Sequence, residues 1–104
     1  MSDEVELTIV LMIFDATDSE KLLGVLSKYI VMSRMHMGCR VIDLSASQTT
    51  AGRFVIVQKW DSPGAQQTHF DSPAMIEMAQ ACQGLLASAP RIELLEGISA
   101  HDLK

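Results

Sequence analysis

Three histidines are the side chains of this chain best suited to acid–base chemistry, because imidazole is the side chain that ordinarily titrates near neutral pH. His69 stands between two Asp-Ser-Pro triplets, at residues 61–63 and 71–73. His36 lies in the methionine-rich run MSRMHMG, where a surface bend is the simpler interpretation. His101 lies in the C-terminal tail, which it would help to hold in place. The spacing of histidines and cysteines does not match that of zinc ligands, so we expect no metal site.

The composition describes a small acidic domain with an aliphatic core. The chain has 104 residues, of which 48% are hydrophobic and 5% aromatic, and its formal net charge is -5. Because nucleic acids and anionic membranes attract basic surfaces, this charge argues against both as partners. Two cysteines, Cys39 and Cys82, are too few for a disulfide scaffold, and we expect free thiols. The acidic N-terminus and the lack of a long apolar run favour a cytoplasmic protein.

The first half of the chain predicts a strand, a helix and a second strand. Residues 5–14 are rich in β-branched side chains and become apolar on both faces, which is typical of a strand buried on both sides. A capping-box pattern, Thr17-x-x-Glu20, precedes a helix, and Gly38 is a candidate break after it. Apolar residues at helical spacing form the buried face of this helix: Leu22, Val25, Leu26, Tyr29 and Ile30. Residues 39–46 predict the second strand.

The second half predicts a third strand, two helices and a last strand. A polar turn leads into residues 54–60, which should pair with the second strand as a hairpin. Each Asp-Ser-Pro triplet places a capping serine before a proline, which favours a short helix to about His69 and then a longer one. The longer helix would present one apolar face, made of Met75, Met78, Ala79, Cys82, Leu85 and Leu86. Residues 91–99 predict the last strand.

The predicted order is β-α-β-β-α-β, with the short helix placed before the second main helix. This is the ferredoxin-like pattern of an α+β domain. Four strands would form an antiparallel sheet with helices on one face only. The first strand would leave apolar side chains on the bare face, and a second copy packed sheet on sheet would cover them. We therefore expect a single domain over residues 1–104 that forms a homodimer.

The run FVIVQKWDSPGAQQTHFDSPAM at residues 54–75 resembles the core motif of the antibiotic biosynthesis monooxygenase family. In that motif a strand ends in an aromatic-x-Glu-x-Trp pattern, a short helix carries a histidine, and Ser-Pro opens a second helix. The matching residues here are Gln58-Lys59-Trp60, His69-Phe70 and Ser72-Pro73. The Met-Gly-Cys at residues 37–39 is similar to a family Pro-Gly-Cys, and Arg34 stands where members often carry arginine.

The resemblance implies a dimeric α/β barrel with a pocket between the sheet and the helices of each subunit. Members oxygenate small phenolic, quinol or polyketide-like aromatic compounds without metal or flavin, so it implies no cofactor and a small aromatic molecule as partner. Such chemistry needs a base, a dry apolar cavity and a donor that stabilises the substrate anion. The family pattern points to His69 as that base. The residues then expected at the substrate are Trp60, Arg34, Phe54 and Met75.

Departures from the family pattern leave other activities open. Gln58 and Ala74 stand where many quinol-oxidising relatives carry a glutamate and a histidine. Heme-degrading relatives use an asparagine on the first strand, a tryptophan and a histidine; this chain has no asparagine in residues 7–14, and has His69 and Ala79 at the other two places. Heme degradation is therefore not expected. A non-oxidative cyclase or isomerase, and a dimeric ligand-binding protein without turnover, remain alternatives to a monooxygenase.

Overall fold

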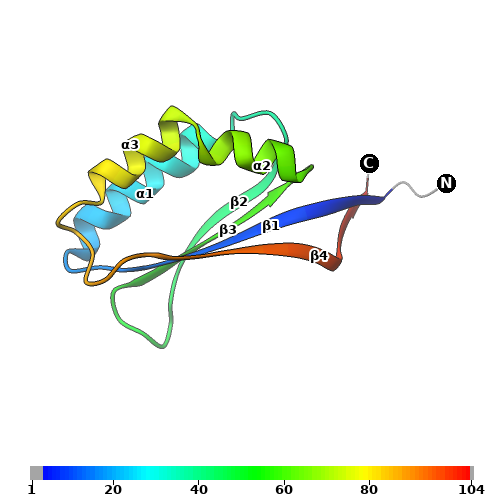
Figure 1. Ribbon diagram of the computed structural model, residues 1–104. Helices are drawn as coiled ribbons and strands as arrows, with labels where there is room; N and C mark the ends of the chain where they lie inside the picture. The colour runs from blue at the N-terminus through cyan, green and yellow to red at the C-terminus, as the bar shows by residue number, and fades with distance from the viewer. Residues whose placement is uncertain (1–3, 104) are drawn as a thin grey trace.

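The computed structural model describes residues 4–103, and the side chains of residues 7–98. Its elements are β1 (Glu4–Asp15), α1 (Ser19–Ser33), β2 (Cys39–Ala46), β3 (Arg53–Trp60), α2 (Pro63–Phe70), α3 (Pro73–Ala81) and β4 (Arg91–Leu103). The strands pair antiparallel in the order β2-β3-β1-β4, and the helices lie over one face of the sheet (Figure 1). This arrangement confirms the predicted ferredoxin-like α+β fold. Within the described residues, no helix is long and apolar enough to cross a lipid bilayer.

Alternation along β1 and β3 sorts their side chains onto the two faces of the sheet. The side chains on the helix-covered face are at most 8% exposed: Val10, Met12 and Phe14 of β1, and Phe54, Ile56 and Gln58 of β3. The side chains between them are half-buried on the opposite face: Ile9, Leu11 and Ile13 of β1, and Val55 and Val57 of β3. The expectation that the first strand is apolar on both faces is confirmed.

The two helices after β3 begin at the serines of the Asp-Ser-Pro triplets, as predicted. Ser62 Oγ and Ser72 Oγ each accept the backbone N–H three residues further on, at 3.1 and 3.4 Å. A proline follows each serine, where its missing N–H costs the helix no hydrogen bond. The sequence therefore fixes the start of α2 and α3, and with α2 the position of His69 near its end.

The predicted start of α1 was wrong by one residue. Asp18, not Thr17, caps the helix, because Asp18 Oδ1 accepts the backbone N–H of Lys21 at 3.1 Å. The Thr17 hydroxyl instead donates to the carbonyl oxygen of Gly84 at 3.3 Å. Aspartate is a strong N-cap, and a tertiary contact uses the threonine elsewhere.

The helix α3 is shorter than the apolar spacing predicted. It ends at Ala81, whereas the spacing continued to Leu86. Gly84 has a φ of +81°, a left-handed conformation that ends helices and that glycine adopts without strain. Beyond it the chain pairs with the end of β1: the Leu85 carbonyl accepts the N–H of Thr17 at 2.9 Å. Pairing between distant segments thus overrides the local helical pattern.

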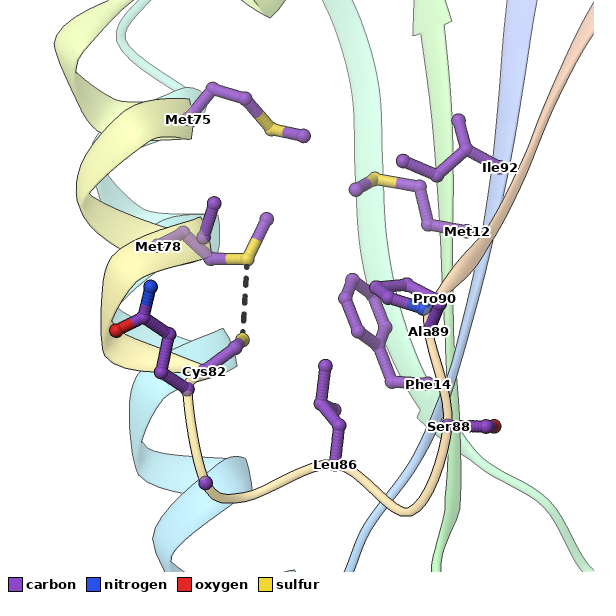
Figure 2. A pocket seen from close by; sticks show the side chains of 13 residues that line it. Met12, Phe14, Met75, Met78, Cys82, Leu86, Ser88, Ala89, Pro90 and Ile92 are labelled. Atoms are coloured by element: carbon purple, nitrogen blue, oxygen red, sulfur yellow. Dashed lines mark hydrogen bonds between the residues drawn. The ribbon is translucent and has the colours of Figure 1, made fainter.

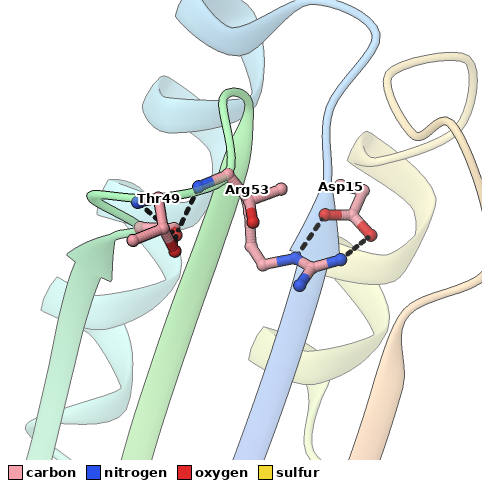
Figure 3. Close-up of polar contacts among 5 residues, drawn as sticks. Asp15, Thr49 and Arg53 are labelled. Carbon is pink, nitrogen blue, oxygen red and sulfur yellow. Dashed lines mark hydrogen bonds and ion pairs between the residues drawn. The ribbon is translucent and has the colours of Figure 1, made fainter.

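An ion pair ties β1 to β3 at the end of the sheet where β3 begins. Arg53 Nε and Nη2 donate to the two carboxylate oxygens of Asp15 at 2.7 and 3.1 Å (Figure 3). The two residues are direct cross-strand partners. The guanidinium lowers the pKa of Asp15, and the carboxylate raises the pKa of Arg53. This two-point contact joins the two central strands at that end of the sheet.

Candidate active site

A cavity of about 500 Å³ lies between α3 and the sheet. Figure 2 shows Met75 and Met78 reaching from α3 toward Met12 and Phe14 of β1. Ile92 lines the cavity from β4 and is 40% exposed, so this side of the cavity meets solvent. Its size is within the range of pockets that hold small organic ligands.

The wall of this cavity is apolar and rich in sulfur. Four sulfur-bearing side chains line it: Met12, Met75, Met78 and Cys82. Cys82 Sγ donates to Met78 Sδ at 3.6 Å, and burial raises the pKa of the Cys82 thiol, which therefore stays protonated at neutral pH. Thioethers are polarizable and flexible, and they make favourable contacts with aromatic rings. The cavity therefore suits a flat aromatic ligand.

Next to the cavity, a chain of buried hydrogen bonds runs from β3 to the turn after α1. Trp60 Nε1 donates to Gln58 Oε1 at 2.9 Å, and Gln58 Nε2 donates to the Tyr29 hydroxyl at 2.7 Å. The Tyr29 oxygen is 2.6 Å from His69 Nε2, and His69 Nδ1 is 2.7 Å from His36 Nδ1. Four side chains in this series are at most 2% exposed, namely Trp60, Gln58, Tyr29 and His69. His36 is half-buried. The chain thus leads from the core to the surface.

The direction of these hydrogen bonds follows from Trp60, because an indole N–H can only donate. The Gln58 oxygen accepts that bond, so its NH₂ group faces the Tyr29 oxygen as a donor. The single Tyr29 proton is then directed at His69 Nε2. A neutral His69 ring therefore carries its own proton on Nδ1, where it donates to His36 Nδ1.

His69 is held neutral by its surroundings. Its side chain is 2% exposed and its ring stacks on that of Trp60, with centroids 4.6 Å apart and an interplanar angle of 28°. Burial, and secondly the nearby His36, lower the pKa of His69 to about 4. At neutral pH its Nε2 is therefore an unprotonated acceptor, as a base requires.

The polar chain meets the apolar cavity at Met12. The second N–H of the Gln58 amide donates to Met12 Sδ at 3.2 Å, and Met12 also lines the cavity. A thioether is a weak acceptor. An oxygen atom of a ligand placed where the Met12 sulfur lies would accept a stronger hydrogen bond from Gln58, so the amide is a donor held directly behind Met12.

The far end of the chain opens into a second depression, of about 350 Å³, at the turn between α1 and β2. Its lining includes the two histidines of the hydrogen-bond series, His36 and His69, together with Met35 and Met37. The two methionines are 82% and 94% exposed, so the rim of this depression meets solvent. Among the described side chains, no group of three or more His, Cys, Asp or Glu could hold a metal ion.

The structure brings together some of the residues expected at the site and separates others. His69 and Trp60 are in contact, and Met75 lines the large cavity. Phe54 is 8% exposed and belongs to the core on the same face of the sheet. Arg34 lies apart from them: its Nη2 donates to the Ile42 carbonyl at 3.3 Å in an exposed surface position.

Sequence reasoning missed three members of the polar chain. Tyr29 was counted only as part of the apolar face of α1, and Gln58 only as a departure from the family motif. His36 was interpreted as part of a surface bend. One signal was available: Tyr29 and Gln58 carry polar groups at positions whose spacing buries them, and buried polar groups require partners.

Comparisons with known proteins agree with this architecture. The family model described as antibiotic biosynthesis monooxygenase matches residues 9–81. No curated protein matches the chain in sequence.

Solved structures of similar fold come from several bacteria. Rv0793 from Mycobacterium tuberculosis is 24% identical, with 90% of this chain and 97% of that chain covered and a TM-score of 0.84. A Caulobacter crescentus protein provisionally named an antibiotic biosynthesis monooxygenase is 19% identical, with 91% and 92% covered and a TM-score of 0.82. SO0527 from Shewanella oneidensis is 20% identical, with 88% and 91% covered and a TM-score of 0.82. Since the family model spans more than half of its length, the chain belongs to the antibiotic biosynthesis monooxygenase family.

Proposed function

We propose that this protein is a cofactor-independent monooxygenase that acts on a small aromatic, quinol or polyketide-like phenolic substrate. One observation carries the proposal: the large apolar cavity meets, at Met12, a buried hydrogen-bond chain that contains a neutral histidine. The cavity would hold the aromatic rings of the substrate. The hydrogen-bond chain would supply two polar functions beside Met12, a donor for an anion and an acceptor for a proton.

Binding places the substrate oxygen against the polar chain. The flexible Met12 side chain turns aside, and the phenol or enol oxygen accepts the N–H of Gln58. The substrate O–H then donates to the Tyr29 oxygen, whose own proton passes to His69 Nε2. His69 thus acts as the base through the Tyr29 hydroxyl. Gln58 and Tyr29 both donate to the resulting anion, in a site from which water is largely excluded.

The anion then reacts with molecular oxygen. In an anthrone-like substrate, the O–H that is deprotonated is that of the enol, in which one hydrogen of the reacting CH₂ group has already moved to the oxygen. The anion transfers one electron to O₂, and the carbon-centred radical and superoxide combine to a peroxide at that carbon. The peroxide takes back the proton and loses water. One oxygen atom remains on the carbon as a carbonyl, and the other leaves as water with the two hydrogens that the carbon has lost.

The other residues expected at the substrate take more specific roles. Met75 contacts the aromatic rings from α3. Trp60 is fully buried, so it acts on the base by stacking on His69 and by orienting the Gln58 amide. Phe54 supports the cavity from the core. Arg34 would reach a substrate only by leaving its surface contact with the Ile42 carbonyl, and the proposal does not need it.

Oxygen uptake tests the proposal directly. The wild-type protein, without added metal or flavin, is incubated with a panel of hydroquinones and anthrone-like phenols in an oxygen electrode. We expect oxygen consumption with at least one aromatic substrate, and a loss of about 10³-fold in turnover for His69→Ala. Gln67→Ala is the matched control, since Gln67 lies exposed on the same helix. Unchanged turnover in His69→Ala would remove histidine from the mechanism, and no oxygen uptake by the wild type would overturn the oxygenase assignment.

We also propose that the protein is a cytoplasmic homodimer. The half-buried apolar side chains on the helix-free face support the dimer, among them Leu11 and Val57, which are direct cross-strand partners. A second copy packed on this face would remove them from water. Light scattering should give twice the 11.4 kDa of one chain, and Val57→Lys should shift the mass toward a single chain. A wild-type protein that stays a single chain at high concentration would contradict the dimer.

A further inference from the structure

The contact between His36 and His69 contains one shared proton. Their Nδ1 atoms are 2.7 Å apart and their rings meet edge to face, with centroids 4.8 Å apart. Two unprotonated nitrogens cannot form a hydrogen bond, and two protonated ones repel each other. One ring must therefore donate and the other accept, and the direction set by Trp60 makes His69 the donor.

We propose that His36 receives the proton that His69 gives up, so that the two histidines form a relay from the buried site to solvent. The inference rests on the proposed function, in which His69 takes a proton from the substrate. It assigns a role to His36 that neither the family resemblance nor the sequence pattern indicates. His36 acts through His69 and does not touch the substrate.

The relay follows from where charge can be tolerated. An imidazolium at His69, 2% exposed and stacked on an indole, would be poorly solvated. His36 is half-buried and lines the depression that opens to solvent. The other residues that line this depression, Met35, Met37, Ala65, Thr68 and Ser72, carry no charge, so the two histidines are its titratable groups. The positive charge is therefore more stable on His36.

The relay consists of three coupled proton shifts. The substrate proton moves to the Tyr29 oxygen, the Tyr29 proton moves to His69 Nε2, and the His69 Nδ1 proton moves to His36 Nδ1. At the end the substrate is an anion, Tyr29 and His69 are neutral, and His36 is an imidazolium. His69 has exchanged one tautomer for the other and never carries a net charge. The reverse shifts return the proton to the peroxide.

Chemical rescue tests the relay. His36→Ala leaves space in an open depression, where imidazole added to the buffer can accept the His69 Nδ1 proton. We expect kcat to fall about 10²-fold with KM little changed. Added imidazole should raise the kcat of the variant at least about 10-fold, in proportion to the concentration of unprotonated imidazole. His36→Gln can accept the same hydrogen bond but fills the space and cannot take a proton, so it should be as slow and resist rescue. Met37→Leu, in the same turn, is the structural control.

The outcomes separate the relay from the proposed function. Full turnover in His36→Ala and His36→Gln, with an active wild type, would overturn the relay and leave the oxygenase intact. A slow His36→Ala that imidazole does not rescue would give His36 a structural role and also overturn the relay. A wild type without oxygenase turnover would overturn the proposed function and, with it, the reaction that the relay serves.

Nitrogen NMR of the wild-type histidines tests the geometry without any variant. In the free protein we expect the proton between the two rings to lie on His69 Nδ1, with His36 Nδ1 as its acceptor. A phenol bound as its anion, detected by its phenolate absorption with 4-nitrophenol as probe, should leave His36 doubly protonated and His69 neutral with its proton on Nε2. The opposite tautomers in the free protein, or a doubly protonated His69 in the complex, would overturn the relay.

Discussion

The two ends of β3 carry polar arrangements of opposite character. At its start, Arg53 forms a two-point ion pair with Asp15 on the neighbouring strand (Figure 3). At its end, Gln58 and Trp60 enter a neutral hydrogen-bond chain that continues to Tyr29 and beyond. The ion pair has side chains that are 31% and 29% exposed, whereas these members of the chain are at most 2% exposed.

The difference shows that one strand can carry a stabilising ion pair at its start and a candidate reactive group of side chains at its end. In the ion pair, the charges of Asp15 and Arg53 compensate each other, and solvent screens both. The buried chain is open at both ends, with one amide N–H on a weak sulfur acceptor and one histidine facing a wet depression. Buried neutral groups that have only weak hydrogen-bond partners can form new hydrogen bonds to a ligand. The Asp15–Arg53 pair is already fully hydrogen-bonded and screened by solvent, so it has no such capacity.

Of the four changes that test this contrast, removal of the Tyr29 hydroxyl should have the largest effect. Tyr29→Phe breaks the chain in its middle, leaving Gln58 Nε2 and His69 Nε2 without their partner. We expect turnover to fall about 10²- to 10³-fold and the free energy of unfolding to fall by about 1–3 kcal/mol. Oxygen uptake and denaturant unfolding measure the two effects. A variant that loses stability but keeps full turnover would show that the chain serves folding only.

Acid should destabilise the protein through His69. Its pKa is about 4 in the folded state, against an ordinary 6.5, so between these values the unfolded chain binds the proton more tightly. The free energy of unfolding should therefore fall as pH is lowered from 7 to 4, by up to about 3 kcal/mol from this group. His69→Gln, which does not titrate, should lose that part of the pH dependence. Parallel curves for the two proteins would contradict the burial argument.

A bulky residue in the cavity should block binding with little effect on stability. Ala79 lines the cavity from an exposed position on α3, so Ala79→Trp can occupy the cavity without overfilling the core. We expect the Kd for an aromatic ligand to rise at least about 10-fold, which is about 1.4 kcal/mol. Gln80→Trp, at an exposed neighbouring position on α3, is the control. Equal affinity in both variants would place the ligand elsewhere.

Loss of the ion pair should have the smallest effect. Asp15→Asn removes the charge that holds Arg53, at a site far along β3 from the buried chain. Turnover should stay at the wild-type value, and the midpoint of thermal unfolding should move less than in Tyr29→Phe. The lowered pKa of Asp15 means that its contribution is present near neutral pH and is lost in acid. A large loss of turnover in Asp15→Asn would contradict the claim that the ion pair takes no part in the reaction.

The order of elements could be predicted because each is marked by local chemistry. Prolines after Ser62 and Ser72 mark two helix starts, and runs rich in β-branched apolar residues mark β1 and β3. The errors arose where distant segments compete with the local pattern. Thr17 faces Gly84 instead of capping α1, and the chain after Gly84 pairs with the end of β1 instead of continuing α3.

The candidate site was predictable only in part, for a related reason. His69 could be selected because a motif surrounds it. Its partners Tyr29 and His36 lie 40 and 33 residues away in the chain, and the fold alone brings them together. Periodicity marked Tyr29 as a core residue, which is correct for its ring and says nothing of its hydroxyl. Hydrogen-bond partners at long range leave no local trace in the sequence.

A crystal structure with a hydroquinone bound is the most direct test of the link between cavity and polar chain. We expect one phenolic oxygen within hydrogen-bond distance of Gln58 Nε2 and the Tyr29 hydroxyl, with the Met12 sulfur displaced from its present contact. A ligand whose oxygens face Ser88 and solvent, while Gln58 Nε2 still donates to Met12 Sδ, would contradict this link.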